Sequence, residues 1–179
     1  MSFKSSSKQY GAVAVTIHWV SALLIFVLLG SGFKAGNAEA STAKIDVLQV
    51  HISIGIAILL LTLARIAWWI FADKKPDPLE MGKWQDRGAR AVHYMFYVVI
   101  LGMVASGIGM IVLSGAAPII FDGSNTTLPD FWDYLPRIPH GIGARLIILL
   151  LVLHAGAALY HHFFKKDGLL HRMWYKKST

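Results

Sequence analysis

The sequence predicts an all-α membrane protein in which four transmembrane helices form one bundle, with residues 1–179 as a single domain. Hydrophobic residues make up 55% of the 179 residues and charged residues only 15%, well below the quarter or so that is usual in soluble domains. Four apolar runs are each long enough for the roughly 20 residues that a helix needs to cross the hydrocarbon core. Lipid is therefore their expected solvent, and each run can satisfy its backbone there only as a helix.

The four expected helices cover about residues 13–33, 47–72, 91–113 and 138–164. The first run has no charged residue between Lys8 and Lys34, and the second is interrupted only by Arg65. The third is expected to end before Gly115 and Pro118, because both residues disfavour a continuing helix. The fourth carries a single arginine near its start.

The first run has an alternative interpretation as a secretory signal. Lys4 and Lys8 precede it, and Ala-Glu-Ala at residues 38–40 resembles a small-x-small cleavage site. The run is, however, longer than the roughly 7 to 15 apolar residues of a signal sequence. Cleavage would also remove His18, on which the site described below depends. We therefore expect a retained helix.

Lys and Arg residues outside the expected helices are divided unevenly between the two sides of the membrane. Twelve lie before the first helix, between the second and third, and after the fourth, against three in the other two connections. By the positive-inside rule both termini are cytoplasmic, and in a bacterium the other two connections are periplasmic. A net charge of +7 spread between apolar runs indicates a membrane surface, and no nucleic-acid partner is expected.

The absence of cysteine narrows the possible metal chemistry. With no cysteine in the chain, disulfides, cysteine-ligated zinc, iron–sulfur clusters and covalently attached c-type haem are excluded. Eight histidines are present, and ionisable side chains inside a bilayer usually face the bundle interior or a cofactor. Ligation by histidine is therefore the expected metal chemistry.

Depth in the membrane pairs four of the histidines. His140 and His154 lie fourteen residues apart on the fourth helix, about 21 Å along its axis and within about 40° of the same face. His51 enters the second helix from the periplasmic side and so matches His140. His18 enters the first helix from the cytoplasmic side and so matches His154. Two sites of two imidazoles each fit tetrahedral zinc poorly, whereas a porphyrin supplies the other four nitrogens, so we expect two b-type haems between facing helices.

Spacing also assigns residues around these sites. Arg65 follows His51 by fourteen residues and is expected beside the cytoplasmic haem, where its guanidinium would bind a propionate or would extend to the interface. Gly55 and Gly32 would let the macrocycle approach a helix backbone. Close helix packing is the alternative for both glycines, and it is the role that we assign to Gly107.

Two further histidines have candidate roles near the cytoplasmic haem. His161 follows His154 by seven residues on the same face, which predicts a catalytic proton donor, with a solvated interfacial group as the alternative. His93 begins the third helix and could replace His18 as a ligand, although it is shallower than His154 requires.

Several segments match one pattern: Thr16-Ile17-His18-Trp19, His51 to Gly55 with Arg65, His93-Tyr94, Pro139-His140, and His154 to Asp167 with Arg172-Met173. This set resembles the bacterial cytochrome b561 family, and the similarity covers nearly the whole chain. The resemblance implies a di-haem b protein of the bacterial inner membrane that exchanges electrons with ubiquinone. Some members resemble superoxide oxidases. Carried over to this chain, the haem ligands are His18, His51, His140 and His154.

The expected function is one-electron transfer by an oxidoreductase, because two histidines per iron leave no open coordination position. An electron would enter at the periplasmic haem and leave from the cytoplasmic haem to ubiquinone, or travel the other way. Superoxide is one candidate donor, although the periplasmic segments carry more acidic than basic residues and would attract it poorly. A periplasmic dehydrogenase or hydrogenase partner docking on residues 115–139 is the alternative donor. A haem-free histidine transporter is the alternative function from another class. A second copy of the chain, forming a homodimer, is the alternative to a dehydrogenase partner.

Overall fold

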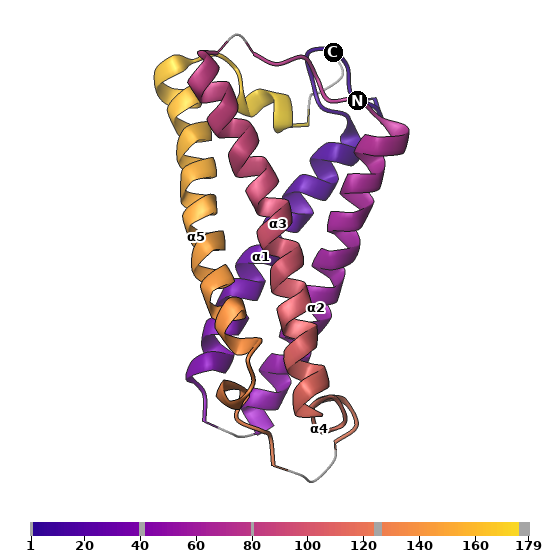
Figure 1. Ribbon diagram of the computed structural model, residues 1–179. Coiled ribbons are helices and arrows are strands. Elements are labelled where there is room, and N and C mark those ends of the chain that lie inside the picture. The colour runs from indigo at the N-terminus through magenta and orange to yellow at the C-terminus, as the bar shows by residue number, and fades with distance from the viewer. Residues whose placement is uncertain (1, 40–41, 80, 124–126, 176–179) are drawn as a thin grey trace. The chain divides into compact units, whose positions relative to one another are not determined.

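The computed structural model describes residues 2–39, 42–79, 81–123 and 127–175. The long helices α1, α2, α3 and α5 are joined by shorter elements (Figure 1), and no strand occurs within these ranges. In chain order the helices are α1 (Ala12–Asn37), α2 (Thr42–Ala67), η1 (Trp68–Ala72), α3 (Lys83–Ser114), α4 (Ala117–Phe121), η2 (Phe131–Asp133), α5 (Arg137–Tyr160), η3 (His161–Lys165) and η4 (Leu170–Met173). The predicted all-α class is confirmed.

Four helical segments are long and apolar enough to cross a membrane, namely Ala12–Asn37, Thr42–Ala72, Lys83–Ser114 and Arg137–Lys165. Each exposes large apolar side chains, among them Leu23 (65% exposed), Leu60 (61%), Val98 (63%) and Val152 (64%). A soluble protein rarely leaves so much contiguous apolar surface in water, whereas lipid solvates it. The prediction of four membrane-spanning helices is confirmed.

The observed helices are longer than the predicted apolar runs. Their outer turns consist of polar residues, which the hydropathy of the sequence does not count as part of a span. α3 begins at Lys83 rather than near residue 91, and Asp86 and Arg90, one turn apart, form an ion pair on its first turns. α1 continues to Asn37, whose side-chain amide donates to the Phe33 carbonyl at 2.9 Å. Similarly, α2 begins at residue 42, five residues before the predicted start. Hydropathy marks the part of a helix that lipid covers, not the whole helix.

The end of α3 agrees with the sequence prediction. Gly115 follows the last residue of α3 with a φ of +63°, a conformation that glycine adopts without steric cost. Pro118 lies in the first turn of α4, where its missing N–H has no intrahelical partner to lose. At the alternative cleavage site, Ala40 lies outside the described residues.

The chain divides into two compact units, each built from segments of the four long helices. Unit 1 comprises Met1–Ala22, Leu61–Tyr97 and Ile148–Thr179, and unit 2 comprises Leu23–Leu60 and Val98–Ile147. His18 and His154 therefore belong to unit 1, and His51 and His140 to unit 2. Each histidine pair predicted from depth falls within one unit.

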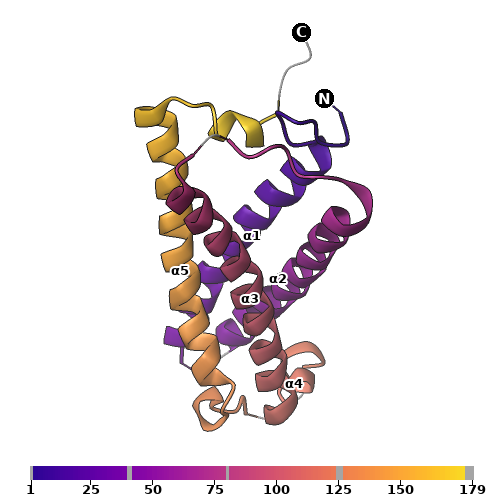
Figure 2. The same cartoon turned by 45° about the horizontal axis from the view of Figure 1, so that its top comes forward.

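In unit 1 an arginine near the C-terminus connects two other segments. Nε and Nη2 of Arg172 donate to the carbonyls of Lys8 at 3.0 Å, Ser7 at 3.3 Å and Asp77 at 2.7 Å. Figure 2 shows the N-terminal segment beside η4. The N-terminal segment, the connection after η1 and the C-terminal segment are thereby fastened to one another.

Asp73 makes a second connection in unit 1. Its carboxylate accepts hydrogen bonds from the Ser5 N–H at 3.0 Å, the Ser5 hydroxyl at 2.8 Å and the Trp68 indole at 3.2 Å. Partial desolvation raises the pKa of Asp73, but hydrogen bonds from Ser5, Lys74 and Trp68 outweigh it and lower the pKa below its usual value. The charged carboxylate is the form that this connection requires.

In unit 2 the short helix α4 is held against α2. Nε2 of Gln49 donates to the Ile120 carbonyl at 2.5 Å. Ile120 and Ala116 are completely buried, so the loop between α3 and α5 begins with an anchored apolar turn rather than a free chain.

Candidate functional site

Two histidine pairs have nearly the same geometry, one in each unit. In unit 2 the ring centroids of His51 on α2 and His140 on α5 are 6.2 Å apart, with the ring planes at 65°. In unit 1 the centroids of His18 on α1 and His154 on α5 are 6.1 Å apart, with the planes at 61°. The structure brings together both pairs that depth in the membrane predicts.

This spacing fits a metal ion held between opposed imidazoles. Two metal–nitrogen bonds of about 2.0 Å each, added to the distance from each nitrogen to its ring centre, place opposed ring centroids about 6 Å apart. No group of three or more His, Cys, Asp or Glu side chains that could hold a metal ion occurs in the described part of the chain. A macrocycle that brings its own four nitrogens therefore fits these residues better than a metal ion bound by protein alone.

His93 lies in unit 1 but does not oppose His154 at this spacing. The His93 and His154 ring centroids are 5.1 Å apart at 84°, closer than the 6.1 Å of the His18 pair. Nδ1 of His93 donates to the Ala89 carbonyl at 2.6 Å. The geometry favours His18 over His93 as the partner of His154.

Arg65 is the cation of the unit 1 site. Its Nη1 lies 3.5 Å from Nδ1 of His18, at the outer limit of a hydrogen bond. Its Nε is buried and has no hydrogen-bond partner among the described residues. A buried guanidinium N–H without an acceptor needs one, and a carboxylate such as a haem propionate meets that need. The side chain is directed to the site predicted for it.

In unit 2 two glycines lie against the histidine rings. A Cβ added to Gly32 would lie 3.1 Å from Cε1 of His51, and one added to Gly107 would lie 3.4 Å from Cε1 of His140. Gly107, which the sequence assigned to helix packing, lies on α3 against the ring of a histidine on α5. An added Cβ at Gly55 would meet no atom within 4 Å, and its predicted role at the haem stays a prediction.

Sequence reasoning missed two serines next to these glycines. The hydroxyl of Ser31 lies 2.9 Å from Nδ1 of His51, and that of Ser106 lies 3.1 Å from Nδ1 of His140. Both serines directly precede the glycine that makes room for the same ring. The repeated Ser-Gly dipeptide is the signal that could have found them.

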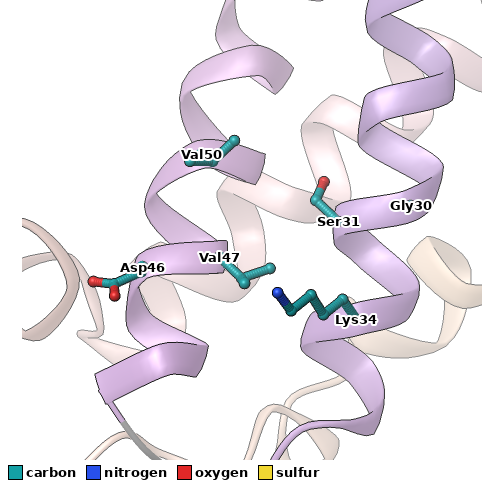
Figure 3. A pocket seen from close by; sticks show the side chains of 6 residues that line it. All are labelled: Gly30, Ser31, Lys34, Asp46, Val47 and Val50. Carbon is teal, nitrogen blue, oxygen red and sulfur yellow. The ribbon is translucent and has the colours of Figure 1, made fainter.

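A cavity of about 270 Å³ lies between α1 and α2 in unit 2, and the serine that contacts His51 is among its lining residues, which are Gly30, Ser31, Lys34, Asp46, Val47 and Val50. Figure 3 shows the Lys34 side chain extended toward Val47, whereas the Asp46 carboxylate points away. The charged group directed into this apolar cavity is therefore a cation. It would favour an anionic group such as a carboxylate.

The candidate proton donor His161 is buried, with 7% of its surface exposed. It begins the π-helical turn η3, an irregularity that is frequent at functional sites. The turn closes through the N–H of Lys166, which donates to the His161 carbonyl at 2.7 Å. The chain then reverses, and an Asp167 carboxylate oxygen lies 2.5 Å from Nδ1 of His161.

The Asp167 contact defines what His161 can do. Partial desolvation raises the pKa of Asp167, but hydrogen bonds from His161 and the Leu169 N–H outweigh it and lower the pKa. An ionised carboxylate can only accept, so Nδ1 of His161 carries a proton, and Nε2 is left to exchange another. Sequence reasoning gave no role to Asp167, because the reversal that brings it back depends on the turn after η3.

Comparison with known proteins identifies a family for this chain. A family profile described as prokaryotic cytochrome b561 matches residues 9–176. The four paired histidines, Arg65 and His161 all lie within this range.

Individual relatives align over almost their whole length. "Cytochrome b561 homolog 2" of Escherichia coli is 28% identical, covering 100% of this chain and 98% of the relative. "Probable superoxide oxidase CybB" of Yersinia pestis is 29% identical, covering 95% and 98%. "Cytochrome b562" of Cereibacter sphaeroides is 26% identical, covering 92% and 94%.

Proposed function

Because this chain belongs to the prokaryotic cytochrome b561 family, we propose that it is a di-haem b oxidoreductase of the bacterial inner membrane that exchanges electrons with ubiquinone. Family membership makes it a multi-pass bacterial membrane cytochrome b that binds haem b and transfers electrons. The number of haems, their ligands and the quinone are our proposal.

The observation that carries the proposal is the matched spacing of the histidine pairs. His51 and His140 would hold one haem, and His18 and His154 the other, because ring centroids 6.2 Å and 6.1 Å apart leave room for one metal ion between two imidazoles. Haem supplies reversible one-electron transfer, and two histidine ligands restrict it to that task. Arg65 would bind a propionate of the unit 1 haem.

His161 would handle the protons that quinone reduction consumes. The Asp167 carboxylate orients the imidazole through Nδ1, leaving Nε2 to give a proton to a quinone oxygen and to recover it from water. Lys165 and Lys166 are exposed beside it, and their charges favour a negatively charged reduced quinone. On the positive-inside rule this end of the protein faces the cytoplasm.

Superoxide is the electron donor to test first, because a relative from Yersinia pestis is named as a probable superoxide oxidase. In unit 2 the Lys34 side chain extends into the cavity between α1 and α2 and would attract an anion. A periplasmic dehydrogenase partner is the alternative, and copurification of a second subunit would favour it.

Stopped-flow oxidation of the dithionite-reduced protein by a short-chain ubiquinone tests the proposal. We expect oxidation of both haem signals in the wild type, and failure of the quinone to oxidise either would contradict the quinone assignment. His161→Gln should slow quinone reduction by about a hundredfold or more, the size expected for a general acid. The matched control is His162→Gln, since His162 is the next residue in η3 and its ring faces His171; it should leave the rate unchanged.

A further inference from the structure

Two helices of unit 2 carry the same short motif opposite the two histidines. On α1 the motif is the Leu28 carbonyl, Ser31 and Gly32, and on α3 it is the Met103 carbonyl, Ser106 and Gly107. In both, the carbonyl precedes the serine by three residues and the glycine follows the serine directly.

On α1 the motif encloses His51. The Ser31 hydroxyl donates to the Leu28 carbonyl at 3.2 Å and lies 2.9 Å from Nδ1 of His51. A hydroxyl has one proton, so once Leu28 accepts it, Ser31 can only accept from His51. This contact therefore requires the proton of His51 to be on Nδ1.

On α3 the same serine contacts enclose His140. The Ser106 hydroxyl donates to the Met103 carbonyl at 2.9 Å and lies 3.1 Å from Nδ1 of His140. That carbonyl is itself 3.1 Å from Nδ1 of His140. Because a carbonyl offers no proton, His140 must donate to it, and Nε2 of His140 is left with its lone pair.

We propose that Leu28–Gly32 and Met103–Gly107 are two matched histidine clamps that fix His51 and His140 in the Nδ1–H tautomer and present both Nε2 atoms to one iron. The proposal rests on the proposed function, in which these two histidines hold a haem. Ser31 and Ser106 are positioning residues in it, since each acts through a histidine.

The glycines are part of each clamp because they bring the serine close enough. An added Cβ would lie 3.1 Å from Cε1 of His51 at Gly32 and 3.4 Å from Cε1 of His140 at Gly107. The separation at Gly32 is tighter than ordinary van der Waals contact, so a side chain there would push the ring away from the hydroxyl, whereas the separation at Gly107 is at the edge of ordinary contact.

The clamps also set the electronic character of the unit 2 site. A ligand imidazole that donates from its second nitrogen becomes a stronger electron donor to the metal, which favours the oxidised iron. At His18 in unit 1 the neighbour of Nδ1 is instead the Arg65 guanidinium, which can only donate. The haem of unit 2 is therefore expected to have the lower midpoint potential of the two.

Redox titration of the membrane protein with serine variants tests the clamps. Ser31→Ala and Ser106→Ala should each raise the midpoint potential of the haem signal that His51→Ala removes, and the double variant should raise it further. At a fixed ambient potential the reduced-to-oxidised ratio of that haem should increase by roughly twofold to tenfold per serine, the equivalent of one hydrogen bond. The other haem should not change.

Ser114→Ala is the matched control. The Ser114 hydroxyl donates to the Ile111 carbonyl at 3.4 Å, the same bond three residues back on α3, without a histidine contact among its hydrogen bonds. Its potentials should equal those of the wild type. An equal shift in Ser114→Ala, or no shift in either clamp variant, would overturn the proposal.

Two further variants are needed in case a serine variant loses its haem. If Ser31→Ala loses the haem, Ser31→Thr should retain it, because threonine keeps a hydroxyl that can bond back to the helix; loss in both variants would overturn the clamp. Retention of both haem signals in His51→Ala would contradict the ligand assignment of the proposed function. An unshifted midpoint potential in Ser31→Ala would contradict only the clamp, so the two failures can be told apart.

Discussion

Arg65 gives the sharpest electrostatic prediction. Its guanidinium lies 3.5 Å from Nδ1 of His18, and its buried Nε has no acceptor among the described residues. Reduction adds a negative charge to the haem, so a fixed cation beside the His18 and His154 site favours the reduced state. Arg65→Gln should therefore lower the midpoint potential of that haem.

The magnitude follows from the geometry. The 3.5 Å contact, the width of the imidazole ring and a metal bond of about 2.0 Å place the guanidinium roughly 7 Å from the iron. At an effective dielectric constant of about 20, unit charges at this separation interact by about 2 kcal/mol. This corresponds to about 90 mV for a one-electron couple, and pairing with a propionate would reduce it to roughly half.

Potentiometric titration of the variant in detergent measures the shift. A decrease of roughly 40 to 90 mV at the unit 1 haem, with the unit 2 haem unchanged, is the expected result. Arg145→Gln is the control, because Arg145 is exposed and donates to the Gly141 carbonyl at 3.1 Å. Equal shifts of both haems, or no shift in either, would refute a site-specific charge at Arg65.

Three other predictions follow from the same structure. His51→Ala and His140→Ala should each remove the same haem signal from the visible spectrum, and a signal shared between His51→Ala and His154→Ala would show that the pairing is wrong. An alkaline phosphatase fusion after the last residue should be inactive, because both termini are predicted to be cytoplasmic; a highly active fusion would reverse the orientation. The depressed pKa of Asp73 contributes stability above its unfolded pKa of about 3.9, which is lost as pH falls through the folded pKa. The melting temperature of the wild type should thus decrease below about pH 4, whereas Asp73→Asn should start lower at neutral pH and lack that part of the decrease.

The sequence predicts the spans well, because membrane insertion depends on apolar length. The predicted helices are nevertheless too short at their ends. The first turns of α3, for example, are stabilised by an ion pair between Asp86 and Arg90, but a hydropathy average counts these turns as a polar loop. The π-helical turns η1 and η3 were not predicted, because a single inserted residue leaves the hydrophobic pattern almost unchanged.

The histidine pairs were predictable because helix rise and rotation alone fix depth and face. What contacts Nδ1 of each ring was not predictable, because it depends on how one helix is rotated against its neighbour. Ser31 and Ser106 were therefore missed, as was the contact of Gly107 with the His140 ring. His161 was selected by its spacing from His154, but its carboxylate partner comes from a turn whose reversal requires left-handed backbone at Lys166.

A pyridine haemochrome assay with a protein determination tests the central claim most directly. Two ring pairs of matching geometry and a sequence without cysteine predict two haems b per chain, both extracted by acidic acetone. One haem per chain, or haem that stays attached to the protein after extraction, would contradict the account.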